Sequence, residues 1–200
     1  MAQTITRTNS HHMRLYSKEA NRLYLNKRER VYLRAIAELQ KAETQFLCLI
    51  LLFTGCRISE ALNLRLCDIQ LDEGCIAINS LKKRDKNHVR QVPVPQSLLN
   101  DIHVHHHTSS TQQKLFNMCR TTAWTRVKSV MQHATVKGTH ATPKGLRHSF
   151  GVNCAFANVA MPLCQKWMGH SDIATTAIYY QIVGEEELKM AKRLWVDTRD

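Results

Sequence analysis

Residues 142–180 read TPKGLRHSFGVNCAFANVAMPLCQKWMGHSDIATTAIYY, and this stretch carries the strongest pattern in the chain. It opens with Thr142-Pro143, a helix-capping residue followed by proline at the first helical position. Apolar side chains then recur at spacings of four, four and three, at Leu146, Phe150, Cys154 and Ala157. That spacing predicts an amphipathic helix, with Arg147 beside its buried face.

The same stretch predicts two further helices. One runs from Met161-Pro162 to the glycine before His170, and the other runs from Asp172 to Tyr180 with Ser171 as its cap. His170 falls between them, and Tyr179 follows nine positions after that histidine. The stretch therefore places an arginine, a histidine and a tyrosine on three neighbouring elements.

A second informative segment lies upstream. Ala42–Thr54 is mostly apolar, which predicts a buried helix ended by Gly55. Arg57 follows at the start of another helix, with Glu60 in its first turn. Such an arginine commonly forms a surface ion pair, here with Glu60 or Asp68. Alternatively, it directs its guanidinium across the helix end toward a ligand.

Two β-strands are predicted at Cys75–Asn79 and Val89–Val94, joined by the basic loop LKKRDKNH. Further helices are predicted within 17–39, from Pro95 to Ile102, and over 122–134. Their apolar positions are Leu25, Val31, Leu33, Ile36 and Leu39 in the first and Trp124, Val127, Val130 and Met131 in the last. The predicted fold class is mainly α with a small antiparallel β-sheet (α+β).

Composition and charge narrow the classes of function. The 28 Lys and Arg against 16 Asp and Glu give a net charge of +12, which favours a polyanionic partner such as nucleic acid. The seven cysteines form no C-x-x-C pair, which indicates a reducing compartment without a disulfide framework or zinc finger. No segment has the pattern of a signal peptide, and the apolar run FLCLILLF is too short to span a bilayer. We therefore expect a cytoplasmic protein with no membrane partner.

The histidine-rich tract DIHVHHHTSS, residues 101–110, invites a metal-site interpretation. In an extended strand, His103, His105 and His107 would share one face. The tract runs into Thr-Ser-Ser-Thr, which is typical of a mobile loop and offers no fixed surroundings for ligands. We therefore expect no metal site here.

Four motifs occur in a fixed order: TGCRISEAL at 54–62, LKKRDKNHVRQVPVP at 81–95, PKGLRHSF at 143–150 and MGHSDIATTAIYY at 168–180. From about residue 49 to residue 180, this pattern resembles the catalytic domain of the tyrosine recombinase (phage integrase) family. The resemblance implies an enzyme that cleaves and rejoins double-stranded DNA through a 3′-phosphotyrosine and requires no metal or cofactor. It also implies a homotetramer on two DNA sites, with a monomer or dimer when free, and a nucleoid-associated protein of bacterial, plasmid or phage origin.

Within this resemblance, the motif residues have implied roles. Arg57 and Arg147 would hold the non-bridging phosphate oxygens, which suits the planar fork of a guanidinium. His170 would donate a hydrogen bond or assist proton movement. Tyr179 would be the nucleophile. Tyr180 is an adjacent alternative, but the spacing from the histidine favours Tyr179.

The resemblance implies further roles for Glu60 and for lysines. The family carries a lysine on the β-hairpin that protonates the leaving 5′ oxygen, and Lys82 fits it best, with Lys83 a near alternative and Lys86 a distant one. Glu60 would orient the arginines or the histidine. Lys144 stands where the family usually has a histidine, three residues before the second arginine. Lysine keeps the positive charge but not the neutral-pH base, so we expect phosphate binding and activity to survive.

The expected domain organisation has three parts. Residues 1–16 form a flexible tail, 17–183 form the catalytic domain without a separate N-terminal core-binding domain, and 184–200 form a C-terminal helix or tail. Leu188, Ala191 and Trp195 give this last segment an apolar stripe, which packs on its own domain or docks on a neighbouring protomer. Without the core-binding domain, either the catalytic domain grips DNA alone or an accessory DNA-binding protein assists.

Three functions fit these observations. The leading one is a site-specific recombinase that performs integration, excision, inversion or multimer resolution for a mobile element. A type IB topoisomerase-like enzyme would use related chemistry as a monomer without paired sites. A non-catalytic DNA-binding accessory or regulator would explain Lys144, but it has no need for Tyr179 beside Arg57 and Arg147.

Overall fold

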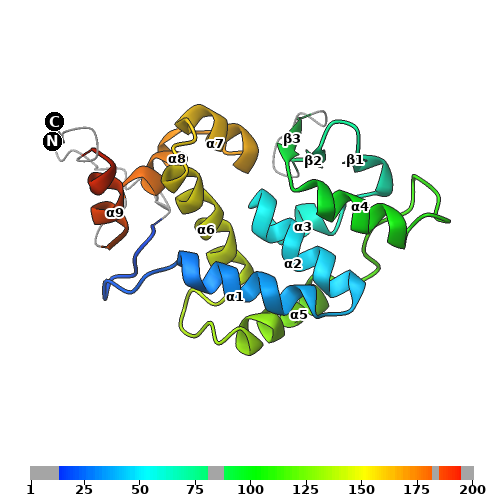
Figure 1. Cartoon of the computed structure of the whole chain (residues 1–200), viewed down its shortest axis with the longest axis horizontal. Helices are drawn as coiled ribbons and strands as arrows, with labels where there is room; N and C mark the ends of the chain where they lie inside the picture. Colours follow the sequence, from blue (N-terminus) through cyan, green and yellow to red (C-terminus); the bar gives the residue numbers. More distant parts are fainter. Residues whose placement is uncertain (1–13, 81–87, 182–184, 195–200) are drawn as a thin grey trace, which may run out of the picture.

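The computed structural model describes residues 14–80, 88–181 and 185–194, and they form a mainly helical domain with a small antiparallel sheet, as predicted (Figure 1). The α-helices are α1 (Lys27–Glu38), α2 (Ala42–Thr54), α3 (Ile58–Ala61), α4 (Gln96–His105), α5 (Arg120–His133), α6 (Pro143–Phe156), α7 (Met161–Met168), α8 (Ala174–Ala177) and α9 (Glu185–Leu194). The 3₁₀ helices are η1 (Leu66–Asp68) and η2 (Ile178–Tyr180), and the strands are β1 (Ile69–Gln70), β2 (Cys75–Asn79) and β3 (Val89–Pro93).

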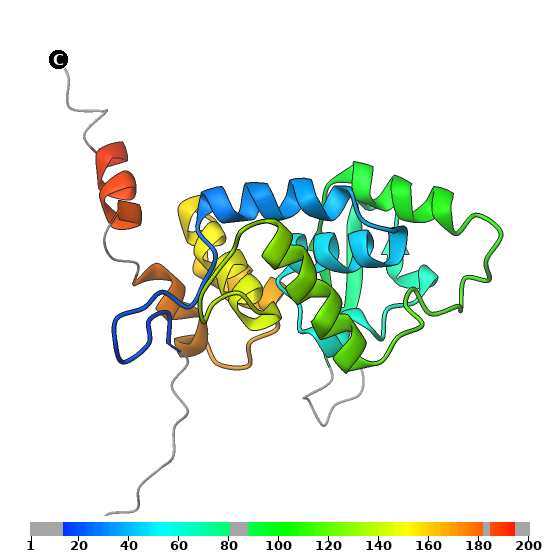
Figure 2. The same cartoon turned by 90° about the horizontal axis from the view of Figure 1, so that it is seen from below.

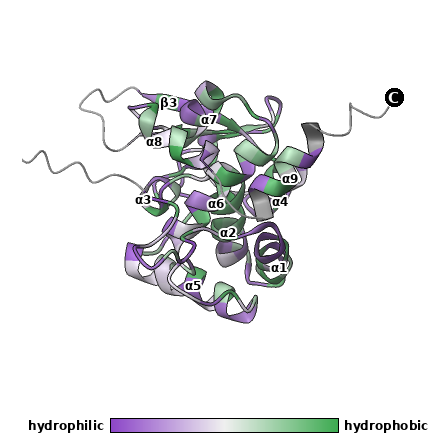
Figure 3. Ribbon diagram, turned by 90° about the vertical axis from the view of Figure 1, so that its left-hand side faces the viewer, coloured by the Kyte–Doolittle hydropathy of each residue, from purple (hydrophilic) through white to green (hydrophobic). Residues whose placement is uncertain are grey.

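Helix α2 is the centre of the core. It packs against α1, α4, α5 and α6, and Figure 3 shows it enclosed by neighbouring helices. Every residue from Phe46 to Leu52 is buried, because this helix is apolar on all sides rather than along one stripe. The helix begins and ends where the sequence predicts, and Gly55 is its C-cap.

The sheet has the order β1-β2-β3 with antiparallel pairing throughout. The two longer strands match the predicted hairpin, whereas the two-residue β1 is too short to give a sequence signal. Val92 pairs with Ile76 and Arg90 pairs with Ile78. Alternate residues of β3 are buried, so Arg90 shares the inward face with Val92.

Helix α6 connects the core to residues 161–180, which include His170 and Tyr179. It packs against α2, α5, α7 and η2, and α7 in turn packs against β3 (Figures 1 and 2). The N-terminus of α6 is capped by Thr142, whose Oγ1 accepts from the amide of Gly145 at 3.0 Å, with Pro143 at the first helical position. These features confirm the predicted helix start.

Three predicted segments differ in the structure. Residues 17–26 precede α1 as turns and a bridge, so only the second half of 17–39 is helical. The helix predicted from Asp172 to Tyr180 is divided into α8 and η2, and the carboxylate of Asp172, rather than Ser171, accepts from the amide of Ala174. The first half of the histidine tract, through His105, is helical in α4 and the following residues form turns, so its histidines do not line one face of a strand.

The burial predicted from apolar periodicity was wrong for three side chains. Val31, Leu39 and Trp124 are 59%, 78% and 45% exposed, although each was expected on a buried face. Leu33 and Val127 are buried as expected. A single apolar residue at a face boundary can point to solvent at modest cost, because much of a protein surface is apolar.

The chain ends differ from each other in packing. Leu15 is buried in the core and Tyr16 forms an isolated bridge with Arg22, so the folded body begins before residue 17. Helix α9 lies at the opposite end of the molecule from the sheet (Figures 1 and 2); Met190 on it is partly buried against the core, whereas Leu188 is 50% exposed. Across the described segments, no helix combines the length and apolar character required to cross a bilayer.

Candidate active site

Two helices end close together, and a glycine forms each end. Gly55 after α2 (φ 59°) and Gly169 after α7 (φ 66°) adopt the left-handed conformation that glycine tolerates without strain. The last carbonyls of a helix lack intrahelical partners and carry partial negative charge. Arg147 on α6 donates from Nη1 to the carbonyl of Gly55 at 2.7 Å and from Nη2 to that of Met168 at 2.8 Å. Its guanidinium is therefore fixed between two helix C-termini.

Glu60 is a buried carboxylate shared by two arginines. One oxygen accepts from Nη1 of Arg57 at 2.7 Å, and the other accepts from the amide of Arg57 at 2.9 Å and from Nη2 of Arg90 at 2.7 Å. Arg90 also donates from Nε to the carbonyl of Trp167 at 2.7 Å, one residue before the end of α7. The side chains of Glu60 and Arg90 are 0% and 2% exposed, whereas that of Arg57 is 29% exposed. Arg57 thus presents the accessible cation of this group.

Tyr179 lies in η2 with its side chain fully buried. Its ring packs directly on Gly151 of α6, where an added Cβ would lie 2.6 Å from the ring carbons. Its Oη lies 3.1 Å from Nδ1 of His148, on the same helix as Gly151. The ring of His170 stacks nearly parallel to the tyrosine ring, with centroids 6.1 Å apart and an angle of 13° between planes. The tyrosine is therefore held between histidines from two separate elements.

The electrostatic environment keeps both histidines neutral at pH 7. Burial, with added repulsion from Arg147 and Arg57, lowers the pKa of His170 to about 3. Burial and the charges of Lys144 and Arg147 lower the pKa of His148 to about 4. Arg147 remains protonated, although burial and the charge of Arg57 lower its pKa to about 10.

The two acidic groups of the site respond in opposite directions. Burial acts to raise the pKa of Glu60, but the charge of Arg90, the amide of Arg57 and the other contacts to the two arginines outweigh it, and the pKa is lowered. Burial raises the pKa of Tyr179, and the nearby charge of Arg147 offsets this only in part. The tyrosine is therefore a neutral phenol in the free protein, and its activation requires a proton acceptor.

Three buried nitrogens of this region have no hydrogen-bond partner among the described residues. They are Nη1 of Arg90, Nε2 of His148 and Nε2 of His170. A buried polar group without a partner is costly in a folded protein and calls for an explanation, such as a ligand that it is built to meet. Three guanidinium groups accompany one carboxylate here, so the ligand that this centre favours is an anion.

The sequence profile that describes the phage integrase family matches residues 13–186, most of the chain. The chain belongs to this family. The tyrosine recombinase XerA of Pyrococcus furiosus is 27% identical over 163 residues, an alignment that covers 76% of this chain and 55% of the relative. The chain thus spans about half the length of that relative.

Solved structures of family members share the fold. A crystal structure of XerA recombinase superimposes with a TM-score of 0.73 at 22% identity, covering 85% of this chain and 64% of that one. XerH site-specific recombinase bound to its difH substrate, described as a pre-cleavage complex, gives a TM-score of 0.68 at 21% identity and covers 90% and 59%. At this identity, the agreement establishes the fold.

The structure brings together five of the seven predicted site residues. Arg57, Glu60, Arg147, His170 and Tyr179 all belong to the centre described above. Lys144 is exposed on the first turn of α6 and acts on the centre through its charge on His148. Lys82, together with its alternatives Lys83 and Lys86, lies outside the described residues. Tyr180, the alternative nucleophile, is directed elsewhere: its hydroxyl donates to the carbonyl of Val159.

Sequence reasoning missed Arg90 and His148. The alternation of β3 places Arg90 on the same face as Val92, and an inward-facing arginine must be paired when it is buried. That signal was available in the segment VRQVP. His148 gave no comparable signal, because its contact with Tyr179 joins residues 31 positions apart through the packing of α6 on η2.

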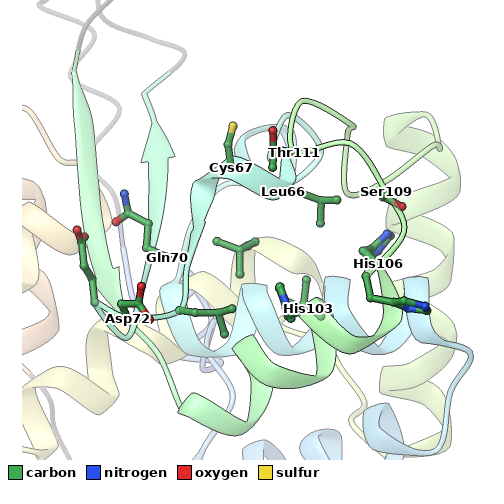
Figure 4. A pocket seen from close by; sticks show the side chains of 13 residues that line it. Leu66, Cys67, Gln70, Asp72, His103, His106, Ser109 and Thr111 are labelled. Atoms are coloured by element: carbon green, nitrogen blue, oxygen red, sulfur yellow. The ribbon is translucent and has the colours of Figure 1, made fainter.

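A pocket of about 510 Å³ lies elsewhere, between η1, β1 and the end of α4 (Figure 4). Its lining includes His103, His106 and His107 together with the acidic residues Asp72 and Glu73. None of the predicted site residues lines it. Within residues 14–80, 88–181 and 185–194, no group of three or more histidine, cysteine or acidic side chains is placed to hold a metal ion.

Proposed function

We propose that this chain carries the catalytic centre of a site-specific DNA recombinase that cleaves and rejoins strands through a 3′-phosphotyrosine. The observation that carries the proposal is the convergence of Tyr179 with Arg57, Arg147 and His170 on one buried, cationic centre, whose buried nitrogens include three with no hydrogen-bond partner among the described residues. A phosphodiester supplies the anion that such a centre favours. Membership of the phage integrase family and the net charge of +12 support DNA as the substrate.

Cleavage would begin with phosphate binding. Arg57, the most exposed guanidinium of the centre, would meet a non-bridging oxygen first, while Arg147 would donate from N–H groups that its two carbonyl acceptors do not use. His170, neutral at pH 7, would donate from Nε2 while its Nδ1 accepts from the hydroxyl of Thr176, 2.9 Å away. These donors would stabilise the charge that accumulates on the phosphoryl oxygens at the pentacoordinate stage.

Strand transfer would then exchange one bond for another. The Oη–P bond forms as the P–O5′ bond breaks, and Lys82 donates a proton to the departing 5′ oxygen. The phosphotyrosine keeps the energy of the broken bond, so a 5′ hydroxyl from another duplex can attack it without ATP or a cofactor. Glu60 would hold Arg57 and Arg90 in place throughout.

The assembly that follows from this mechanism is a homotetramer on two double-stranded DNA sites, with a monomer or dimer in the free state. An accessory DNA-binding protein would make further contacts with the duplex. Helix α9, with Leu188 half exposed, would bind either its own domain or a neighbouring protomer.

Covalent trapping tests this function. A duplex selected from a random-sequence pool by its binding to the chain would be prepared with a nick next to the cleavage position, so that the cleaved fragment diffuses away. We expect the wild type and Tyr180→Phe to form a denaturant-resistant protein–DNA adduct and Tyr179→Phe to form none. Binding of the duplex without an adduct from the wild type would replace the proposal with the DNA-binding accessory, and a Lys144→His variant that restored cleavage would identify the cause.

A further inference from the structure

We propose that His148 is the general base that removes the proton from the hydroxyl of Tyr179. The inference rests on the proposed function and assigns a role that the family pattern leaves open here, because Lys144 stands where a histidine is usual. It starts from the distance of 3.1 Å between Nδ1 of His148 and Oη of Tyr179. That distance is within the reach that a proton transfer requires.

The other candidates in the centre are less well placed. His170 lies with its ring stacked on the tyrosine ring, and its Nδ1 is engaged with Thr176. Lys144 is exposed on the first turn of α6, and it acts on the buried centre through its charge on His148. His148 combines the contact with a neutral ring, because burial and the charges of Lys144 and Arg147 disfavour its protonation.

The proposed role requires one tautomer of His148, in which Nδ1 accepts from the hydroxyl of Tyr179. The phenol of Tyr179 keeps its proton, because burial raises its pKa, and it can donate that proton to Nδ1. The ring hydrogen of His148 then lies on Nε2, one of the three buried nitrogens without a partner among the described residues. In this tautomer, His148 directs a lone pair toward the nucleophile, which is the arrangement that a base needs.

Substrate binding would strengthen this base. A phosphodiester between Arg57 and Arg147 places a negative charge among the cations that disfavour a protonated His148. In the cleavage step, the Oη–H bond breaks, the proton moves to Nδ1 of His148, the Oη–P bond forms and the P–O5′ bond breaks. When a 5′ hydroxyl later attacks the phosphotyrosine, His148 returns the proton to the tyrosine oxygen.

The first test is single-turnover cleavage of the nicked duplex between pH 4 and 9, a range that begins at the pKa of His148 in the free protein. His148→Ala is expected to slow adduct formation by about 10²- to 10⁴-fold, the range for loss of a general base, without weakening DNA binding. Added imidazole should restore part of the rate, since it can occupy the space left by the side chain. His133→Ala removes an exposed histidine from α5 and should cleave like the wild type.

A substrate with a better leaving group distinguishes the role of His148 as a base from that of Lys82 as an acid. A duplex with a 5′-bridging sulfur needs no acid for its departure, so this substrate should restore cleavage by Lys82→Ala but not by His148→Ala. His148→Gln, which preserves polarity, should fold like the wild type and lose the acidic limb of the pH profile. A His148→Ala variant that is as fast as the wild type, or slow with an unchanged pH profile and no response to imidazole, would overturn the proposal.

A second measurement does not depend on cleavage. In DNA-free protein, ¹⁵N NMR of His148 should report a neutral ring with Nδ1 unprotonated at pH 7, and protonation at Nδ1 would contradict the assignment. Failure of the wild type to form any adduct would overturn the proposed function and this inference together. An active wild type with an unaffected His148→Ala variant would overturn the inference alone.

Discussion

Two regions of this molecule gather histidines, and they have opposite properties. His148 and His170 are buried next to Arg147 and Tyr179, and burial with nearby positive charge lowers the pKa of both histidines. The histidines at the end of α4 border an open pocket, and His103 and His107 there are exposed. The sequence draws attention to the second group, which is dense in histidine. The difference shows that burial and charge, rather than the local number of histidines, distinguish the candidate active site from the pocket at the end of α4.

The largest loss of stability should come from breaking the buried ion pair between Glu60 and Arg90. Arg90→Leu leaves Glu60 with one of its two arginines and should lower the free energy of unfolding by about 3–5 kcal/mol, measured by urea denaturation. Glu73→Gln removes a charge at the open pocket and is the matched control, with a change of less than about 1 kcal/mol. Equal effects from the two variants would remove the distinction between the regions.

A pH titration sharpens the comparison. The pKa values of His148 and His170, about 4 and about 3, lie below the ordinary value of 6.5, so the unfolded chain binds more protons than the folded chain between these limits. Stability is therefore complete above pH 6.5 and should fall by about 1.4 kcal/mol per pH unit for each histidine as the pH drops toward 4. Urea midpoints at pH 7, 6 and 5 measure this slope, and the double variant His148→Gln/His170→Gln should flatten it. A slope that the double variant leaves unchanged would contradict the assignment.

The smallest effect is expected at the open pocket. The double variant His103→Ala/His107→Ala should change the free energy of unfolding by no more than about 0.5 kcal/mol, as is usual for exposed positions. Adduct formation on the nicked duplex should also stay at the wild-type level. A large loss of cleavage would show that this pocket takes part in the reaction.

Local sequence signals predict some elements of this fold and not others. The buried helix α2, the strand pair and the capped start of α6 are specified by local signals, namely an apolar run, alternation, and a Thr-Pro pair, and all were predicted. The division of Asp172–Tyr180 into α8 and η2 was missed, because the packing of Tyr179 on Gly151 is a tertiary constraint that no local preference reveals.

The candidate site divides in the same way. The motif order located Arg57, Glu60, Arg147, His170 and Tyr179, and the structure places them together. The motif order could not reveal that Glu60 accepts hydrogen bonds from two arginines, nor that His148 contacts the tyrosine oxygen. Both contacts depend on how separate elements pack. The role of Lys82 stays a prediction.

The acceptors that hold Arg147 are main-chain oxygens, and this has a consequence for how the protein can vary. Replacement of Met168 alters the packing of α7 but leaves its carbonyl in place, so the anchor for the guanidinium does not depend on that side chain. A carboxylate anchor would be lost by a single substitution. By contrast, the glycine that closes each of the two helices fixes where those oxygens point. The site can therefore accept changes in the side chains around the arginine more readily than changes in the path of its backbone.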